Sequence, residues 1–253
     1  MDRAALIAGW KKDEAAPFFG WDFSHHAGRV REEDPPWDYM ALAREAMAQC
    51  TSVLDIATGG GERFAQLAPF PGHARAMEGY GPNVFVAQAR LEPLGVQVLA
   101  CGESQPMPFT DGEFDLILNR HGGCWNPELG RVTRSGGHLL TQQVGPGNFA
   151  DLMDAFAAKA AWPDDWPENS LALVTSKLAE QGFEILRGQE WMGRTHYQDV
   201  GALVYDLKAI PWLVPGFTVD GHLESLFRLQ QRLETEGGLS FQSSRFLIKA
   251  RKR

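Results

Sequence analysis

Short apolar runs alternate with amphipathic stretches along most of the chain. Apolar runs of this length are typical of buried strands, and the longer amphipathic stretches are typical of helices. The predicted strands cover 53–56, 74–77, 95–100, 114–118, 138–143, 183–191 and 239–250, and the predicted helices cover 37–49, 62–68, 83–94, 149–161, 170–181, 199–210 and 220–236. Strands and helices that alternate in this way predict a single α/β domain.

Composition and charge narrow the possible functions. The net charge of −8 argues against a nonspecific nucleic-acid binder, because phosphate contacts need clustered Lys and Arg, and the basic end at 249–253 fits a solvated terminus. Three cysteines, Cys50, Cys101 and Cys124, fit neither a disulfide framework nor a zinc cluster. No apolar run is long enough to span a bilayer and residues 1–13 carry charges, so we expect a cytoplasmic protein with no membrane partner.

A glycine-rich turn follows the first predicted strand. Three successive glycines, Gly59 to Gly61, let the backbone turn tightly, and we expect them to face a bulky ligand. Backbone N–H groups at the start of the next helix suit an anionic or polar ligand group. A dinucleotide-binding turn would require a glycine at Phe64, where the large ring does not fit. An ordinary glycine-rich turn is the alternative.

The same stretch resembles motif I of the class I S-adenosylmethionine-dependent methyltransferases. Residues 55–61 read Asp-Ile-Ala-Thr-Gly-Gly-Gly and depart from the family at Ala57, where glycine is usual. The segment 106–117 and the glycine pair at 136–137 resemble later motifs of the family. The resemblance covers about 37–191 motif by motif. It implies a Rossmann-like, doubly wound sheet of seven mostly parallel strands, with an antiparallel last strand.

The resemblance also implies S-adenosylmethionine as the cofactor and a set of residues that hold it. Asp55, Gly59 and Gly61 are expected around the methionine end. Glu78 lies at a strand end about twenty residues beyond the turn, where an acid accepts hydrogen bonds from ribose hydroxyls, although a surface carboxylate is the alternative. Glu103 is expected to meet the adenine. The full expected set is Asp55, Ala57, Thr58, Gly59, Gly61, Glu78, Gly79, Gly102, Glu103, Ser104 and Asn119.

The acceptor side of the site is less well defined by the sequence. His121 follows the fourth predicted strand and is a candidate general base, with Asn119 and Arg120 in the same corner; the competing interpretation is that His121 caps a turn. Gln142 and Gln143 are expected near the pocket, although one of two consecutive strand residues should face away. Methyl transfer requires no metal. A small-molecule acceptor is favoured over RNA, and a noncatalytic cofactor-binding protein stays possible.

The expected organisation is one methyltransferase domain with two appendages. Residues 1–50 form an N-terminal cover, 51–191 the cofactor-binding core, 192–238 a helical insertion, and 239–253 the last strand and basic tail. In the N-terminal cover, the candidate lid residues are His25, His26 and Arg29, and exposed loop residues are the alternative. The apolar insertion is interpreted either as a lid over a small substrate or as the surface of a homodimer.

Overall fold

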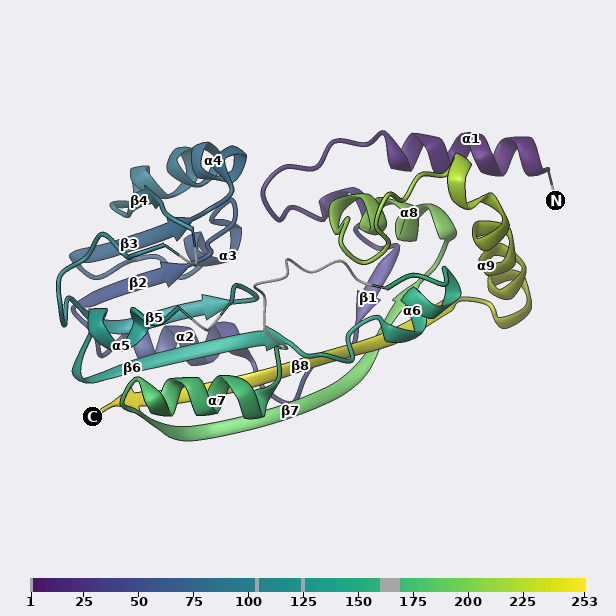
Figure 1. Ribbon diagram of the computed structural model, residues 1–253. Helices are drawn as coiled ribbons and strands as arrows, with labels where there is room; N and C mark the ends of the chain where they lie inside the picture. Colours follow the sequence, from purple (N-terminus) through teal and green to yellow (C-terminus); the bar gives the residue numbers. More distant parts are fainter. Residues whose placement is uncertain (1, 103–104, 124–125, 160–168) are drawn as a thin grey trace.

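The computed structural model describes residues 2–102, 105–123, 126–159 and 169–253. Within this part of the chain, one sheet of eight strands has the order β1-β7-β8-β6-β5-β2-β3-β4 (Figure 1). The strands are β1 (Val30–Glu32), β2 (Ser52–Ile56), β3 (His73–Glu78), β4 (Gln97–Ala100), β5 (Phe114–Arg120), β6 (Thr133–Val144), β7 (Phe183–Tyr197) and β8 (Leu239–Lys252).

The strand directions confirm the predicted fold class. Strands β2 to β6 pair in parallel, whereas β8, the last strand, runs antiparallel to both of its neighbours, β6 and β7. The sheet has one strand more than the seven expected, because β1 pairs antiparallel with the end of β7. A strand of three residues is too short to show a period of two, so the sequence pattern does not reveal β1.

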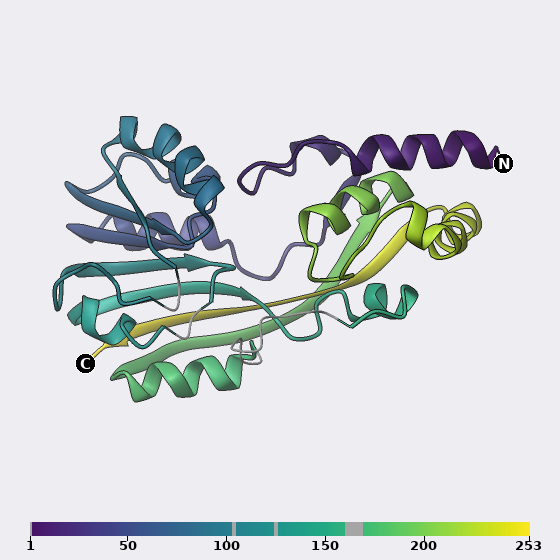
Figure 2. The same cartoon turned by 45° about the horizontal axis from the view of Figure 1, so that its top comes forward.

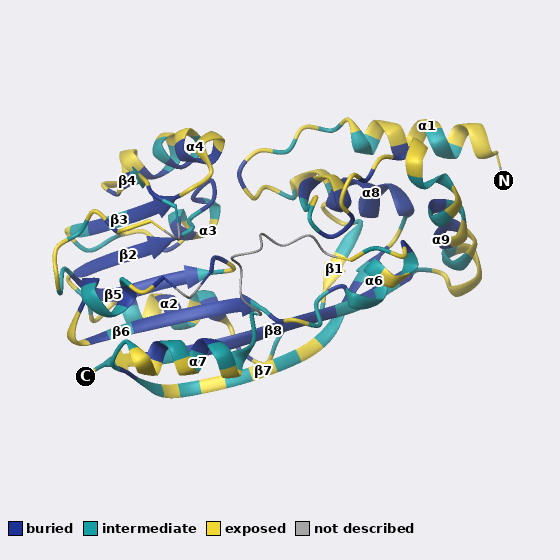
Figure 3. Ribbon diagram, in the orientation of Figure 1, coloured by how far each residue is buried: buried dark blue, intermediate teal, exposed yellow. Residues whose placement is uncertain are grey.

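Strand β7 corrects another sequence-based boundary. The predicted strand ends at residue 191, but β7 continues to Tyr197 and pairs with β8 along its whole length. Met192 is exposed, and much of β7 alternates between half-buried and exposed positions (Figure 3). Backbone hydrogen bonds to β8 sustain the strand where apolar side chains do not mark it. Both long strands therefore extend well beyond the parallel core of the sheet.

Helices cover both faces of that core. On one face lie α2 (Tyr39–Met47), α3 (Glu62–Ala65) and α4 (Gly81–Leu91), and on the other lie α5 (Leu129–Val132) and α7 (Leu171–Glu180). Alternate strand residues contribute to the two layers: Leu116 and Leu118 pack on the α2 side, and Ile117 packs on the α7 side. This is the two-layer burial expected of a doubly wound sheet.

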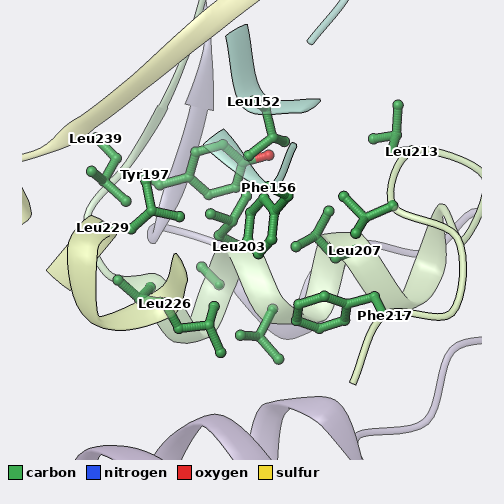
Figure 4. Packing of buried hydrophobic residues seen from close by; sticks show 14 of the residues in the cluster. Leu152, Phe156, Tyr197, Leu203, Leu207, Leu213, Phe217, Leu226, Leu229 and Leu239 are labelled. Atoms are coloured by element: carbon green, nitrogen blue, oxygen red, sulfur yellow. The ribbon is translucent and has the colours of Figure 1, made fainter. Parts of the chain in front are cut away.

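The remaining α-helices form a third apolar cluster around the extensions of β7 and β8, which we call the distal lobe. It comprises α1 (Arg3–Glu14), α6 (Ala150–Ala155), α8 (Val200–Ala209) and α9 (Leu223–Glu236). Figures 1 and 2 show these helices gathered at the opposite end of the molecule from α4. Apolar residues of the insertion, among them Leu213, Val214 and Phe217, are buried in this cluster (Figure 4). These side chains therefore pack against other residues of the same chain.

Several helix boundaries differ from the expected ones. Helix α1 was not predicted, because it buries only Trp10 and shows almost no apolar stripe; Asp2 stabilises its start by accepting from two backbone N–H groups. Helix α6 is much shorter than the predicted 149–161, and residues 160–161 lie outside the described part of the chain. Helix α2 agrees well, and Asp38 caps it by accepting from the N–H of Ala41.

None of the helices in the described ranges combines the length and the apolar character that a bilayer span requires.

Candidate functional site

The glycine-rich turn joins the end of β2 to α3 through several left-handed residues. Gly59 and Gly61 have φ angles of 61° and 77°, and Ala57 has a φ of 54°. A left-handed conformation costs a non-glycine residue about 1–2 kcal/mol. Ala57 therefore holds a conformation that suits glycine, at the position where the sequence departs from motif I.

The neighbours of Gly59 and Gly61 in this structure are side chains of the same chain. A Cβ at position 59 would lie 2.3 Å from Cδ1 of Trp21, and a Cβ at position 61 would lie 2.8 Å from two atoms of Leu91. The expected contact with a ligand stays a prediction, and close packing against these side chains is one reason for glycine at both positions. The sequence pattern misses this because Trp21 lies almost forty residues before the turn.

Trp21 belongs to a loop that the distal lobe holds over the glycine-rich turn. Its ring meets the ring of Trp212 edge-on, with centroids 6.2 Å apart. The hydroxyl of Tyr205 on α8 lies 3.3 Å and 3.4 Å from the carbonyl oxygens of Pro17 and Asp22, on either side of this loop. The N-terminal segment and the insertion thus together cover the turn.

The three candidate lid residues tie the N-terminal segment to itself and to the distal lobe. The guanidinium of Arg29 binds the carboxylates of Asp13 and Asp199, and His25 lies 2.8 Å from Asp13. His26 lies 2.8 Å from Asp206 of α8. Their contacts explain how the segment is anchored. A contact with cofactor or substrate stays a prediction.

Two buried carboxyl groups stand at neighbouring strand ends. Glu78, the last residue of β3, accepts hydrogen bonds from the N–H groups of Gly59, at 2.7 Å, and Tyr80, at 2.8 Å. Burial is the largest cause of a raised pKa for Glu78. Burial also raises the pKa of Asp55 to about 7, and the neighbouring Glu78 adds to this, whereas the positive charge of Arg120 opposes it. Asp55 is thus poised between its charged and neutral forms near neutral pH.

The ends of β3 and β4 approach each other closely through their glycines. A Cβ on Gly79 would lie 2.8 Å from Cα of Gly102, so the two expected cofactor residues stand in backbone contact. The side chain of Gln105 accepts a hydrogen bond from the N–H of Gly102. The expected adenine contacts, Glu103 and Ser104, lie outside the described residues.

Asn119 shapes the turn that follows β5. Its fully buried side chain donates to the carbonyl oxygen of Gly123 and accepts from the N–H of Gly122. It also accepts from the amide of Gln143, which in turn donates to Thr141. Asn119 therefore caps this turn, and its expected contact with the cofactor stays a prediction.

His121 has a left-handed backbone, with a φ of 65°, and its ring contacts the side chain of Gln142. Trp37 donates to the amide oxygen of Gln142 at 2.8 Å, which leaves the amide N–H₂ to donate to Nε2 of His121 at 3.0 Å. The ring proton of neutral His121 consequently lies on Nδ1. The surrounding protein and the nearby Arg120, Arg245 and Arg63 lower the pKa of His121 below its ordinary value, although the residue is exposed at the surface. The ring is neutral at pH 7, as a general base requires.

An open cavity of about 750 Å³ lies beside this ring system. Gln142 lines it, whereas Gln143 faces the layer of Asn119, so the two glutamines alternate as strand residues should. The cavity is also lined by Trp37, Tyr39, Arg63, Arg120 and Arg245. Arg63 and Arg245 are not among the residues that the sequence predicts for the site. A charged residue inside the buried central strand β8 was the signal that could have identified Arg245.

Within the ranges that the structure describes, no three His, Cys, Asp or Glu side chains converge to hold a metal ion.

Comparison with known proteins identifies similar folds. No protein-family model matches the sequence, and no curated protein matches it either. Among solved structures, one assigned as a methyltransferase of Bacillus halodurans is 22% identical, covers 84% of this chain and 98% of its own, and has a TM-score of 0.58. A geranyl diphosphate methyltransferase, solved with GPP and sinefungin, is 15% identical, covers 85% and 77%, and has a TM-score of 0.52.

A third similar structure is a [4+2]-cyclase, which is 15% identical, covers 99% of this chain and 93% of its own, and has a TM-score of 0.54. At these identities, the similarities concern the fold. The chain has the fold of the class I S-adenosylmethionine-dependent methyltransferases.

Proposed function

We propose that this protein transfers a methyl group from S-adenosylmethionine to a small molecule. The observation that carries the proposal is the presence, on a class I methyltransferase fold, of two buried carboxyl groups and a glycine-rich turn at the ends of β2 and β3, with an open cavity at the end of β5, where Arg120 lines it. Ligands of open α/β sheets bind at the carboxyl ends of the strands. A cavity of about 750 Å³ has the size of a small-molecule site.

The chemistry of the carboxyl groups fits this cofactor. S-adenosylmethionine carries an ammonium and a sulfonium, and a buried carboxyl with a raised pKa is stabilised in its charged form by a cation. Asp55 would hold the methionine end, together with the turn at Ala57, Thr58, Gly59 and Gly61. Glu78 already accepts two backbone N–H groups, and the remaining lone pairs of its carboxylate can accept from ribose hydroxyls. Gly79, Gly102, Glu103, Ser104 and Asn119 complete the proposed set.

The bound cofactor supplies an already activated methyl group. The protein then has to orient the acceptor and keep water away, and Trp21 and Trp37 cover two sides of the proposed site. A neutral amine acceptor needs no general base. For a hydroxyl acceptor, Nε2 of His121 would take the proton, and its hydrogen bond from Gln142 would be exchanged for one from the acceptor.

A different activity on the same fold is the second candidate. The [4+2]-cyclase among the similar structures has a class of reaction other than methyl transfer by its printed name. The packing of Trp21 on Gly59 also accounts for part of the turn without a ligand. A protein that binds the cofactor and does not transfer its methyl group would fit these two observations.

Tritium-labelled S-adenosylmethionine tests the function directly. The protein is incubated with extracted metabolites and extracted RNA in one mixture, and the label is then separated by size. We expect label in the small-molecule fraction. Label in RNA alone would favour an RNA methyltransferase, and cofactor binding with no labelled product would favour the second candidate.

The raised pKa of Asp55 predicts how cofactor affinity depends on pH. Between about pH 4 and 7 the folded protein keeps a proton on Asp55 that the unfolded chain releases, and a cationic ligand must displace it. Affinity for S-adenosylhomocysteine, which keeps the ammonium, should be about tenfold lower at pH 6 than at pH 8. Calorimetry measures both values. In Asp55→Asn this pH dependence should disappear, and an unchanged dependence in that variant would remove Asp55 from the site.

A further inference from the structure

Three arginines, Arg63, Arg120 and Arg245, and four acidic residues, Glu32, Glu33, Asp34 and Asp38, line the cavity beside His121. Arg245, on β8, binds the carboxylate of Glu32 at 2.5 Å and the side chain of Asn148 at 2.6 Å. In contrast, the guanidinium groups of Arg63 and Arg120 make no ion pair or hydrogen bond with any residue that the structure describes. Arg63 is exposed, whereas Arg120 is half-buried, and an unpaired charge that is partly withdrawn from water lowers stability. Arg120 therefore needs an explanation.

The acidic residues at this cavity are mostly engaged elsewhere. Glu32 pairs with Arg245, and Glu33 lies 3.0 Å from His196 and also accepts from a backbone N–H. Asp38 caps α2. Asp34 is exposed at the outer side. The acids thus come from the 32–38 segment, whereas Arg120 stands at the end of β5, next to His121.

The position of Arg120 connects the cavity to the proposed methyl-transfer site. Its charge acts on Asp55 on one side, which lies in the proposed cofactor site, and on His121 on the other. Burial, and the like charges of Arg63 and Arg245, lower the pKa of Arg120 to about 10. An anion between these guanidinium groups would relieve that repulsion. The indole of Trp37 and the amide of Gln142 supply the adjoining wall.

We propose that this cavity binds an oxyanion group of the methyl acceptor, a carboxylate or a phosphate, with Arg120 as its principal partner and Arg63 as a second. That the anion belongs to a methyl acceptor rests on the proposed methyl-transfer function. The anion site itself rests on the residues that line the cavity. Guanidinium groups bind both kinds of oxyanion through paired N–H donors, so the two sources share one chemistry.

The test is anion binding to the full-length protein without cofactor. Thermal unfolding is followed with inorganic phosphate and with succinate at constant ionic strength, for the parent, for Arg120→Gln and for the control Arg228→Gln. Arg228 is an exposed arginine on α9, so the control removes the same charge far from the cavity. We expect the parent and the control to be stabilised equally, and Arg120→Gln to bind the anion at least tenfold more weakly.

Stabilisation by phosphate alone identifies a phosphate-bearing acceptor, by succinate alone a carboxylic acid, and by both the shared oxyanion chemistry. No stabilisation by either, or equal stabilisation in Arg120→Gln, overturns the proposal. Since an unpaired charge is removed, Arg120→Gln should keep or raise the Tm of the unliganded protein. If it does not fold, Arg63→Gln decides, because Arg63 is exposed on α3. Loss of methyl transfer with retained anion binding would reject only the proposed function.

Discussion

Replacing His121 by alanine is expected to lower the turnover of a hydroxyl acceptor by about 10²–10⁴, the range for loss of a general base. Nε2 of His121 is the unprotonated ring nitrogen. The hydrogen bonds from Trp37 to Gln142 and from Gln142 to His121 fix the orientation of the ring. The lowered pKa keeps His121 neutral, so the parent should lose no activity to its protonation between pH 7 and 9. Steady-state kinetics with saturating cofactor measures the change in turnover.

The control for this prediction is His138→Ala. His138 lies near the start of the core part of β6, where it pairs with Leu116, at the opposite end of the parallel strands from His121. Cofactor affinity should be unchanged in both variants. Turnover near that of the parent in His121→Ala would reject the base. Joint loss of cofactor binding and stability would instead indicate that His121 is structural.

Glu78→Ala is expected to weaken cofactor binding by about 1.5–3 kcal/mol, or roughly 10-fold to 150-fold, the scale of hydrogen bonds to a charged acceptor. The carboxylate has two roles, because it also orders the turn through the N–H groups of Gly59 and Tyr80. The variant should therefore lower the Tm of the unliganded protein as well. Calorimetry with S-adenosylhomocysteine and thermal unfolding separate the two effects.

Glu113→Ala is the matched control, since Glu113 precedes β5 at the other end of the sheet and pairs with His73. It should change cofactor affinity little. If Glu78→Ala lowers the Tm but leaves affinity at the value of the parent, Glu78 serves only the turn and does not contact the ribose.

The core of the fold could be predicted because its strands are buried on both faces. Strands β2 and β5 are largely apolar runs. The glycine-rich turn after β2 fixed the point in the sequence from which the later motifs could be located. Strand β1 and helix α1 could not be predicted in this way. They are held by β7 and by α8, elements far away in the sequence, and their own patterns are too short or too weak.

The same distinction, between local patterns and contacts made by distant elements, applies to the candidate site. Residues at strand ends, such as Asp55 and Glu78, could be placed because parallel strands bring their carboxyl ends to one edge. Trp21, Arg63 and Arg245 could not, because they reach the site from the N-terminal loop, from α3 and from β8, and only the folded chain brings them together. Trp21 also packs closely against Gly59, and the sequence pattern does not reveal this neighbour.

The central claim is that this edge of the sheet binds S-adenosylmethionine. Isothermal titration of the full-length protein with S-adenosylmethionine, its demethylated product and NAD tests it most directly. We predict saturable binding of the first two, weakened in Glu78→Ala, and no binding of NAD, because Phe64 occupies the position where a dinucleotide turn needs glycine. Binding of NAD without binding of S-adenosylmethionine would contradict the account.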